Sequence, residues 1–203
     1  MRRIVLLRHG LTSWNVEGRF QGQADVALCE SGIGQAKTAA EALASYEPSL
    51  LVSSDLMRAR VTAEALAAAT GLALQSDERL REIDVGQLQG LTHAEAVERF
   101  GRGPWDYAAF GGESQMAAGR RVAAVIDEVA ARLGEGECAV LVSHGAALRV
   151  GLLTFLGWPL EQVAALGALA NCGWVELVDE KSSWAARAPW RLAAYNRVAG
   201  DFD

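Results

Sequence analysis

Hydrophobic positions follow two alternating patterns along the chain. Short continuous apolar runs, which suit strands buried on both faces of a sheet, occur at residues 4–7, 50–53, 139–142 and 174–178, and a further strand is predicted at 72–75. Between them, apolar residues recur at helical spacing over 33–43, 56–66 and 122–133. The alternation predicts an α/β fold in three layers, with a mostly parallel sheet covered by helices on both faces.

Glycines and small polar residues mark the expected helix ends. A left-handed C-terminal residue is favoured after four helical segments, at Gly71, Gly101, Gly134 and Gly157. Thr92 to Glu95 form the spacing of a capping box, and the stretch 53–55, Ser-Ser-Asp, is expected to cap the helix that follows the second strand.

The length and composition favour one domain. With 203 residues, 51% of them hydrophobic, the chain can fill one core, so we expect a single domain over residues 1–203. The one long irregular stretch, 103–112, includes Trp105, Tyr107 and Phe110. We expect it to be a structured loop that covers a pocket, with Trp105 as the aromatic contact.

Charge and cysteine content exclude several classes of protein. The formal net charge of −6 argues against nucleic acid as a partner, because such binding relies on a dense basic surface. The run at 4–7 is too short for a secretory segment or a membrane span, so we expect a cytoplasmic protein with no membrane partner. Three cysteines without CxxC spacing suggest neither disulfides nor a zinc site.

Chemically reactive side chains follow the predicted strands. Arg8 and His9 come directly after the first strand, and His144 follows the strand at 139–142. Arg58 falls in the first turn of the helix after the second strand, and Glu82 lies in the loop after 72–75. Because the carboxyl ends of parallel strands meet at one edge of a sheet, these five residues are expected to converge.

Such a set of side chains suits phosphoryl transfer. Arg8 and Arg58 supply fixed cationic donors for the phosphoryl oxygens, and His144 supplies a further donor. A neutral imidazole can attack phosphorus, which we assign to His9. Glu82 would protonate the leaving alkoxide and later deprotonate water.

A glycine follows each of these histidines. Gly10 comes after His9, and Gly145 comes after His144. Glycine is expected where the backbone must approach a ligand closely, so both are predicted to lie against the bound phosphate group.

Five sequence blocks resemble the histidine phosphatase superfamily, the phosphoglycerate mutase-like proteins. They are "LLRHGLTSWN", "VSSDLMRARVTAEAL", "LREIDVGQLQGLT", "GGES" and "LVSHGAALR". The resemblance implies a metal-independent phosphatase that needs no cofactor, with a phosphohistidine on His9, Glu82 as proton donor and a small phosphomonoester as substrate. It also implies a phosphate pocket built from four side chains: Arg8, Asn15, Arg58 and His144. Gln21 and Gly22 would line the substrate side of this pocket. Dimers are frequent in the family, so the resemblance also makes a homodimer the expected assembly.

Two comparisons within the family refine the expected activity. Only residues 83–143 separate Glu82 from His144, whereas the mutases have a longer insertion there, and "EIDVGQLQG" lacks the mutase signature Glu-Arg-His-Tyr-Gly. These differences favour hydrolysis over phosphoglycerate mutase activity. The blocks "RLRE", "GQLQGLTHAE", "ALGALANCGWVEL" and "WRLAAYN" are similar to actinobacterial phosphatases that act on glucosyl-3-phosphoglycerate, which is therefore the first substrate to test.

One position departs from the family pattern. Cys29 stands where family members usually have Ser or Thr as a helix N-cap, and a thiol is a poor hydrogen-bond acceptor. We expect this helix to begin less firmly, at a cost of about 1 kcal/mol.

Other interpretations remain open at this stage. Two histidines and a carboxylate also form the facial triad of non-haem iron enzymes, although Arg8 and Arg58 would repel a divalent cation. A phosphoprotein-binding module without catalytic activity is a further alternative. It would need neither a nucleophile nor an acid, whereas this chain has both His9 and Glu82. Asp84 is the alternative to Glu82 as the acid. His93 is expected on the surface, and Arg149 or Arg120 is expected to meet a substrate carboxylate.

Overall fold

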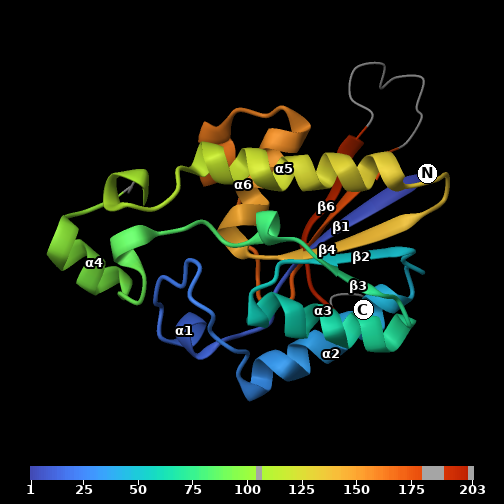
Figure 1. Ribbon diagram of the computed structural model, residues 1–203, viewed down its shortest axis with the longest axis horizontal. Helices are drawn as coiled ribbons and strands as arrows, with labels where there is room; N and C mark the ends of the chain where they lie inside the picture. The colour runs from blue at the N-terminus through green and yellow to red at the C-terminus, as the bar shows by residue number, and fades with distance from the viewer. Residues whose placement is uncertain (104–106, 180–189, 201–203) are drawn as a thin grey trace.

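A computed structural model of the chain places one mixed sheet between two layers of helices (Figure 1). It describes residues 1–103, 107–179 and 190–200. The strands in these ranges are β1 (Arg2–Arg8), β2 (Leu50–Ser53), β3 (Leu74–Ser76), β4 (Cys138–Ser143), β5 (Trp174–Asp179) and β6 (Trp190–Arg197). The helices are α1 (Ser13–Val16), α2 (Glu30–Ala44), α3 (Met57–Thr70), α4 (His93–Phe100), α5 (Gln115–Arg132) and α6 (Gly145–Leu156). Four short 3₁₀ helices are η1 (Glu78–Leu80), η2 (Gly86–Leu88), η3 (Tyr107–Phe110) and η4 (Leu160–Ala164).

The strand order across the sheet is β3-β2-β4-β1-β5-β6. The first four strands are parallel, which confirms the predicted parallel sheet for this part. The predicted strand at 174–178 is present as β5, but it runs antiparallel to β1, and β6 runs antiparallel to β5. A continuous apolar run indicates burial on both faces and contains no information on direction, so the reversal of β5 was not predicted. β6 was not predicted either, because its residues are mostly exposed or half-buried and do not form such a run.

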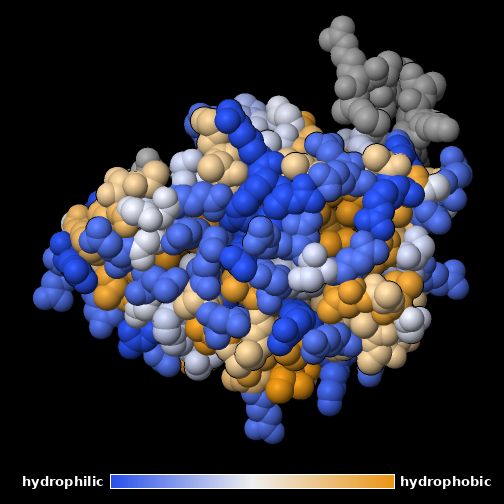
Figure 2. Space-filling view, in the orientation of Figure 1, coloured by the Kyte–Doolittle hydropathy of each residue, from blue (hydrophilic) through white to orange (hydrophobic). Residues whose placement is uncertain are grey.

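Alternate residues of the central strands pack against opposite helical layers. In β1, Ile4 and Leu6 belong to the core beneath α5 and α6, while Val5 and Leu7 belong to the core against α2 and α3. The exposed side of α5 is mostly hydrophilic (Figure 2), as expected for a helix that buries one apolar stripe. The three-layer α/β/α prediction is thereby confirmed.

Two of the four predicted glycine caps have the left-handed conformation. Gly71 and Gly157 end α3 and α6 with φ of 74° and 67°. Gly101 ends α4 with φ of 82° but an extended ψ of 178°. Gly134 is not a cap, because α5 ends at an extended Leu133, so this prediction is wrong.

The N-terminal caps also differ in part from expectation. Thr92 caps α4 in a reciprocal capping box with Glu95, as predicted. The expected cap at 53–55 is wrong, because Asp55 forms an ion pair with Arg81 and the N–H of Met57 donates instead to the Asp25 carboxylate at 2.6 Å. That bond ties the loop before α2 to the start of α3.

The N-cap of α2 matches the expectation from the sequence. Cys29 occupies the cap position and its side chain makes no capping hydrogen bond. The helix therefore begins without the acceptor that Ser or Thr would supply.

The carboxyl ends of β1, β2 and β4 form one edge of the sheet. The chain beyond this edge includes α1, α4 and η3, which lie at the same end of the molecule in Figure 1. A small separate core of Val85, Leu88 and Ala96 holds this region together. Within the described ranges, no helix is both long and apolar enough to span a membrane.

Candidate active site

His9 directly follows β1 and is held in one tautomer. Its Nδ1 lies 2.7 Å from the carbonyl oxygen of Gly10. A carbonyl only accepts, so Nδ1 has the proton and Nε2 retains a lone pair. The His9 carbonyl accepts from the Cys172 N–H at 3.2 Å and from the Asn171 side-chain amide at 3.1 Å, which fixes the backbone behind the ring.

The environment keeps the His9 ring neutral. The residue is only 2% exposed, and burial lowers its pKa well below the ordinary value, assisted by the positive charges of Arg58 and Arg8. A neutral imidazole with a free Nε2 is the form required of a nucleophile.

Arg58 joins three parts of the site. Its Nε donates to Nδ1 of His144 at 3.2 Å, and its terminal nitrogens donate to the carbonyls of Ala24 at 2.6 Å and Gly22 at 2.7 Å. Burial lowers the pKa of Arg58 to about 10, which leaves the guanidinium charged at neutral pH.

Arg8 supplies the second buried positive charge. Its Nη1 donates to the carbonyl of Leu169, while its buried Nε has no hydrogen-bond partner among the described residues. Burial lowers the pKa of Arg8, and the charge of Glu82 opposes that shift. A buried donor without an acceptor beside His9 suits an anionic ligand that would supply one.

His144 is adjacent to His9 but is fully engaged with protein groups. The ring centroids lie 5.2 Å apart. Nδ1 of His144 accepts from Arg58, so Nε2 has the proton and donates to the Ser54 hydroxyl at 3.0 Å. Burial lowers the pKa of His144 well below the ordinary value, and the positive charge of Arg58 lowers it further. The structure shows His144 positioning Arg58, and its direct donation to a phosphoryl oxygen stays a prediction.

The two glycines after the histidines are crowded by protein atoms. A Cβ on Gly10 would lie 2.5 Å from the carbonyl oxygen of Gly32 in α2. A Cβ on Gly145 would lie 3.3 Å from Nε of Arg8. Glycine is therefore required at position 10 for close packing of the chain, whereas a side chain at position 145 would need the Arg8 side chain to shift by a few tenths of an ångström.

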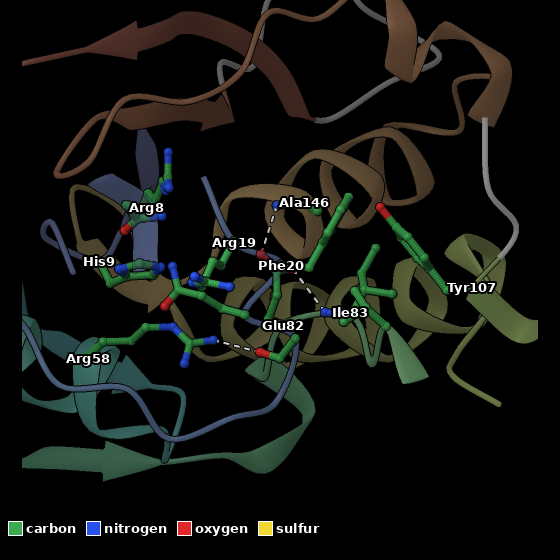
Figure 3. A pocket seen from close by; sticks show the side chains of 13 residues that line it. Arg8, His9, Arg19, Phe20, Arg58, Glu82, Ile83, Tyr107 and Ala146 are labelled. Atoms are coloured by element: carbon green, nitrogen blue, oxygen red, sulfur yellow. Dashed lines mark hydrogen bonds between the residues drawn. The ribbon is translucent and has the colours of Figure 1, made fainter. Parts of the chain in front are cut away.

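Glu82 lies opposite these cations, at the start of α6 (Figure 3). Its carboxylate accepts from the backbone N–H groups of Ile83 at 2.9 Å, Ala146 at 3.2 Å and Ala147 at 2.8 Å. Asp84, the alternative acid, instead accepts from the Gly86 N–H in its own turn and does not line the pocket. The geometry therefore favours Glu82.

Arg8, His9, Arg58 and Glu82 line a cavity of about 180 Å³. His144 and Gly145, which were also predicted for the phosphate site, do not line it. Seven residues predicted from sequence line it: Arg8, His9, Asn15, Gln21, Gly22, Arg58 and Glu82. Oδ1 of Asn15 accepts from the backbone N–H and hydroxyl of Thr12 and from the side-chain amide of Asn171. The amide nitrogen of Asn15 has no hydrogen-bond partner among the described residues, so they leave it available to a ligand. Oε1 of Gln21 is buried without a partner in the described part of the chain.

Six further residues of the lining were not predicted as site residues: Arg19, Phe20, Ile83, Val85, Tyr107 and Ala146. Tyr107 belongs to the aromatic stretch expected to cover a pocket, so that signal was present, although Trp105 was preferred. Trp105 lies outside the described residues. The pKa of Tyr107 is raised by burial and by the charge of Glu82.

Several other predicted residues lie away from the cavity. Arg149 donates to the carbonyls of Val163 and Leu166, and neither it nor the exposed Arg120 lines the pocket. His93 is exposed on α4, as expected. Within the described ranges, no group of three His, Cys, Asp or Glu side chains is placed to hold a metal ion.

Acidification between pH 6.5 and 5.0 is expected to destabilise the protein through the two buried histidines. Their folded pKa values are lowered, so the unfolded chain binds more protons below about pH 6.5. Stability is therefore fully present above that pH and is lost as the pH falls towards the folded values, by about 1.4 kcal/mol per pH unit for each histidine. Urea unfolding at several pH values measures this slope. The variant His144→Asn should halve it, and a slope of zero for the unmodified protein would contradict the assignment.

Comparison with known proteins agrees with this geometry. The family model for the histidine phosphatase superfamily (branch 1) matches residues 4–189. The glucosyl-3-phosphoglycerate phosphatase of Mycobacterium tuberculosis is 39% identical, covering 98% of this chain and 96% of the relative. The probable phosphoglycerate mutase GpmB of Salmonella paratyphi A is 37% identical, with 92% and 89% covered.

A solved structure extends the likeness to three dimensions. The mycobacterial glucosyl-3-phosphoglycerate phosphatase complexed with VO₃ superposes with a TM-score of 0.85 at 38% identity, covering 97% of this chain and 99% of the other. Because the family model spans most of the chain and the relatives share its fold, this chain belongs to branch 1 of the histidine phosphatase superfamily.

Proposed function

We propose that this chain hydrolyses a small phosphomonoester through a phosphohistidine on His9. The observation that supports this most strongly is the state of the His9 ring: Nδ1 donates to the Gly10 carbonyl and Nε2 has a free lone pair beside two buried guanidinium groups. An anion placed in the cavity meets positive charge and a nucleophile together.

In the first step, Nε2 of His9 forms a bond to phosphorus and the bond to the leaving oxygen breaks. Arg8 and Arg58 stabilise the charge on the non-bridging oxygens, with the amide of Asn15 as a further donor. Glu82 enters this step protonated and gives its proton to the leaving oxygen, which departs as an alcohol.

In the second step, water takes the place of the leaving alcohol. The carboxylate of Glu82 accepts a proton from the water as its oxygen attacks phosphorus, and the bond between phosphorus and Nε2 breaks. Inorganic phosphate leaves, and His9 and Glu82 return to their starting protonation states. His144 keeps Arg58 in place throughout.

The geometry disfavours the iron alternative. Both ring nitrogens of His144 are engaged, one by Arg58 and one by Ser54, so neither is free to bind a metal. The charged guanidinium of Arg58 would also repel a divalent cation at this position.

The first candidate substrate is glucosyl-3-phosphoglycerate. Relatives of that name cover nearly the whole chain, and the outer wall of the cavity offers groups suited to such a leaving group. Phe20 and Tyr107 supply aromatic surface for a sugar ring. Arg19 lines the same cavity, but its charge is already paired with Glu17 and Glu95. Phosphoglycerate mutase activity is the second candidate, because relatives named as probable mutases also match.

A phosphate-release screen tests this proposal. The panel compares glucosyl-3-phosphoglycerate with 3-phosphoglycerate, phosphoserine, sugar phosphates and phosphopeptides. We expect the highest kcat/KM for glucosyl-3-phosphoglycerate. Preference for phosphopeptides would exclude a small-molecule substrate, and conversion of 3-phosphoglycerate to 2-phosphoglycerate without phosphate release would identify a mutase.

The cellular setting of the protein stays a prediction. We propose a cytoplasmic enzyme with no nucleic-acid or membrane partner that assembles as a homodimer. Light scattering of the purified chain measures the oligomeric state directly.

A further inference from the structure

We infer that Arg121 and Glu113 form a brace that positions Glu82 for proton transfer. Glu113 belongs to the block "GGES", which has been given no role so far, and Arg121 lies on α5 eight residues further along the chain. Neither residue lines the cavity, so both act through Glu82 as positioning residues. The inference rests on the proposed function, because it assumes that Glu82 is the acid.

Arg121 binds the backbone on the N-terminal side of Glu82 and at Glu82 itself. Its Nη1 donates to the carbonyls of Arg79 at 2.7 Å and Arg81 at 2.6 Å. Its Nη2 donates to the carbonyl of Glu82 at 3.0 Å, which also accepts from Gln23 at 3.3 Å. One planar guanidinium therefore holds three carbonyls of the loop that contains the acid.

Glu113 fixes the orientation of that guanidinium. Its two carboxylate oxygens accept from Nε and Nη2 of Arg121 at 2.8 and 2.7 Å. The two side chains are only 18% and 20% exposed, so the pair is mostly shielded from water. A bidentate pair in this setting has one preferred geometry and leaves Nη1 directed at the loop.

The block "GGES" also binds the backbone on the C-terminal side of Glu82. The N–H of Glu113 donates to the carbonyl of Asp84 at 2.8 Å. A Cβ on Gly112 would lie 2.3 Å from that same carbonyl oxygen, so glycine is needed for this approach. The loop is thereby held on both sides of the acid, by one ion pair and the backbone beside it.

Holding the backbone matters because the carboxylate must reach the N–H groups of another element, α6, from the loop that contains Glu82. Its hydrogen bonds go to the N–H groups of Ile83, Ala146 and Ala147, and they set its orientation relative to α6. Its distance from the leaving oxygen depends on where the loop lies. Proton transfer requires hydrogen-bond reach, and a displacement of about 1 Å can reduce a rate roughly a hundredfold.

A brace and a purely structural ion pair predict different kinetics. Loss of a structural contact lowers the amount of folded enzyme and reduces all activities by the same factor. Loss of acid positioning reduces hydrolysis of an alkyl phosphate, whose leaving group needs a proton, more than hydrolysis of p-nitrophenyl phosphate, whose leaving group does not. The ratio of kcat/KM for the alkyl phosphate to kcat/KM for p-nitrophenyl phosphate therefore separates the two roles.

The experiment measures this ratio in the full-length protein and in matched variants. Glu82→Gln provides the reference for complete loss of the acid. Arg121→Met removes the guanidinium at similar volume, Glu113→Gln weakens the pair while keeping its shape, and Arg121→Lys restores charge without the planar fork. Arg132→Met, an exposed position on the same helix, is the control.

We expect Arg121→Met to lower the ratio at least tenfold, with smaller losses for Glu113→Gln and Arg121→Lys and none for Arg132→Met. In a Glu82→Gln background, Arg121→Met should lower the ratio less than twofold further, because the acid is already absent. A ratio equal to that of the unmodified protein in folded Glu113→Gln and Arg121→Lys would overturn the brace, even if Arg121→Met does not fold. An unmodified protein without phosphatase activity, or a Glu82→Gln ratio that does not change, would instead refute the proposed function and the brace with it.

Discussion

Replacing His9 by alanine is expected to leave a folded protein that neither turns over phosphomonoesters nor forms a phosphoenzyme. Among the described residues, the side chain makes one hydrogen bond, to the carbonyl of the next residue, so its removal breaks no long-range hydrogen bond and loses only the ring contact with His144. It does remove the lone pair that would attack phosphorus. Rapid quench with a labelled phosphomonoester should trap a base-stable, acid-labile phosphoenzyme in the unmodified protein and none in the variant.

The control for this experiment is the histidine on the surface. His93→Ala changes an exposed residue of α4, far from β1 in sequence, and should keep both label and turnover. His9→Ala with a near-normal rate would show that another residue attacks phosphorus, and the proposed mechanism would be wrong.

Arg58→Ala is expected to lower kcat/KM by roughly 10² to 10³, as found for loss of one preorganised donor to a developing oxyanion. It should also reduce the free energy of unfolding. The substitution leaves His144 Nδ1 and the carbonyl of Gly22 without their donor, and each unsatisfied buried acceptor costs about 1–3 kcal/mol. The carbonyl of Ala24 keeps the N–H of Val26 as a donor. Steady-state kinetics and urea unfolding measure the two effects separately.

The same helix offers a matched control for Arg58. Arg60 is exposed and pairs with Glu64 one turn away, so Arg60→Ala should change stability by about 0.5 kcal/mol or less and leave kcat/KM unchanged. Arg58→Lys retains a charge but has one nitrogen in place of three, so it should recover only part of the lost activity. Folded Arg58→Ala with kcat/KM within threefold of the unmodified protein would remove Arg58 from the proposed phosphate site.

The sequence was sufficient to predict the centre of the fold and most of the cavity. Buried parallel strands require continuous apolar runs, and the residues that follow them must meet at one edge. Arg8, His9, Arg58 and Glu82 were found by that argument, and the structure brings all four to one cavity.

Features set by distant contacts could not be read from the sequence in the same way. Asp25 caps α3 from a loop that precedes α2, while Asp55, the nearer candidate, is taken by Arg81. Arg149 looked available for a substrate because its backbone partners lie in a separate segment near η4. Arg121 was overlooked for the same reason, since its importance arises from carbonyl groups about forty positions earlier in the chain.

The pairing of β1 with β4 has a consequence for how the protein becomes active during synthesis. Arg8 at the end of β1 lies opposite Ser143 at the end of β4, so the two histidines become neighbours only after nearly three quarters of the chain has been made. Closing so long a segment is entropically costly, and contacts of this kind form slowly. A nascent chain that already contains Arg8, His9, Arg58 and Glu82 still lacks the strand that completes the centre of its sheet. A chain that ends before β4 therefore cannot place His144 beside His9 and Arg58, and the proposed site is incomplete until that strand has been made.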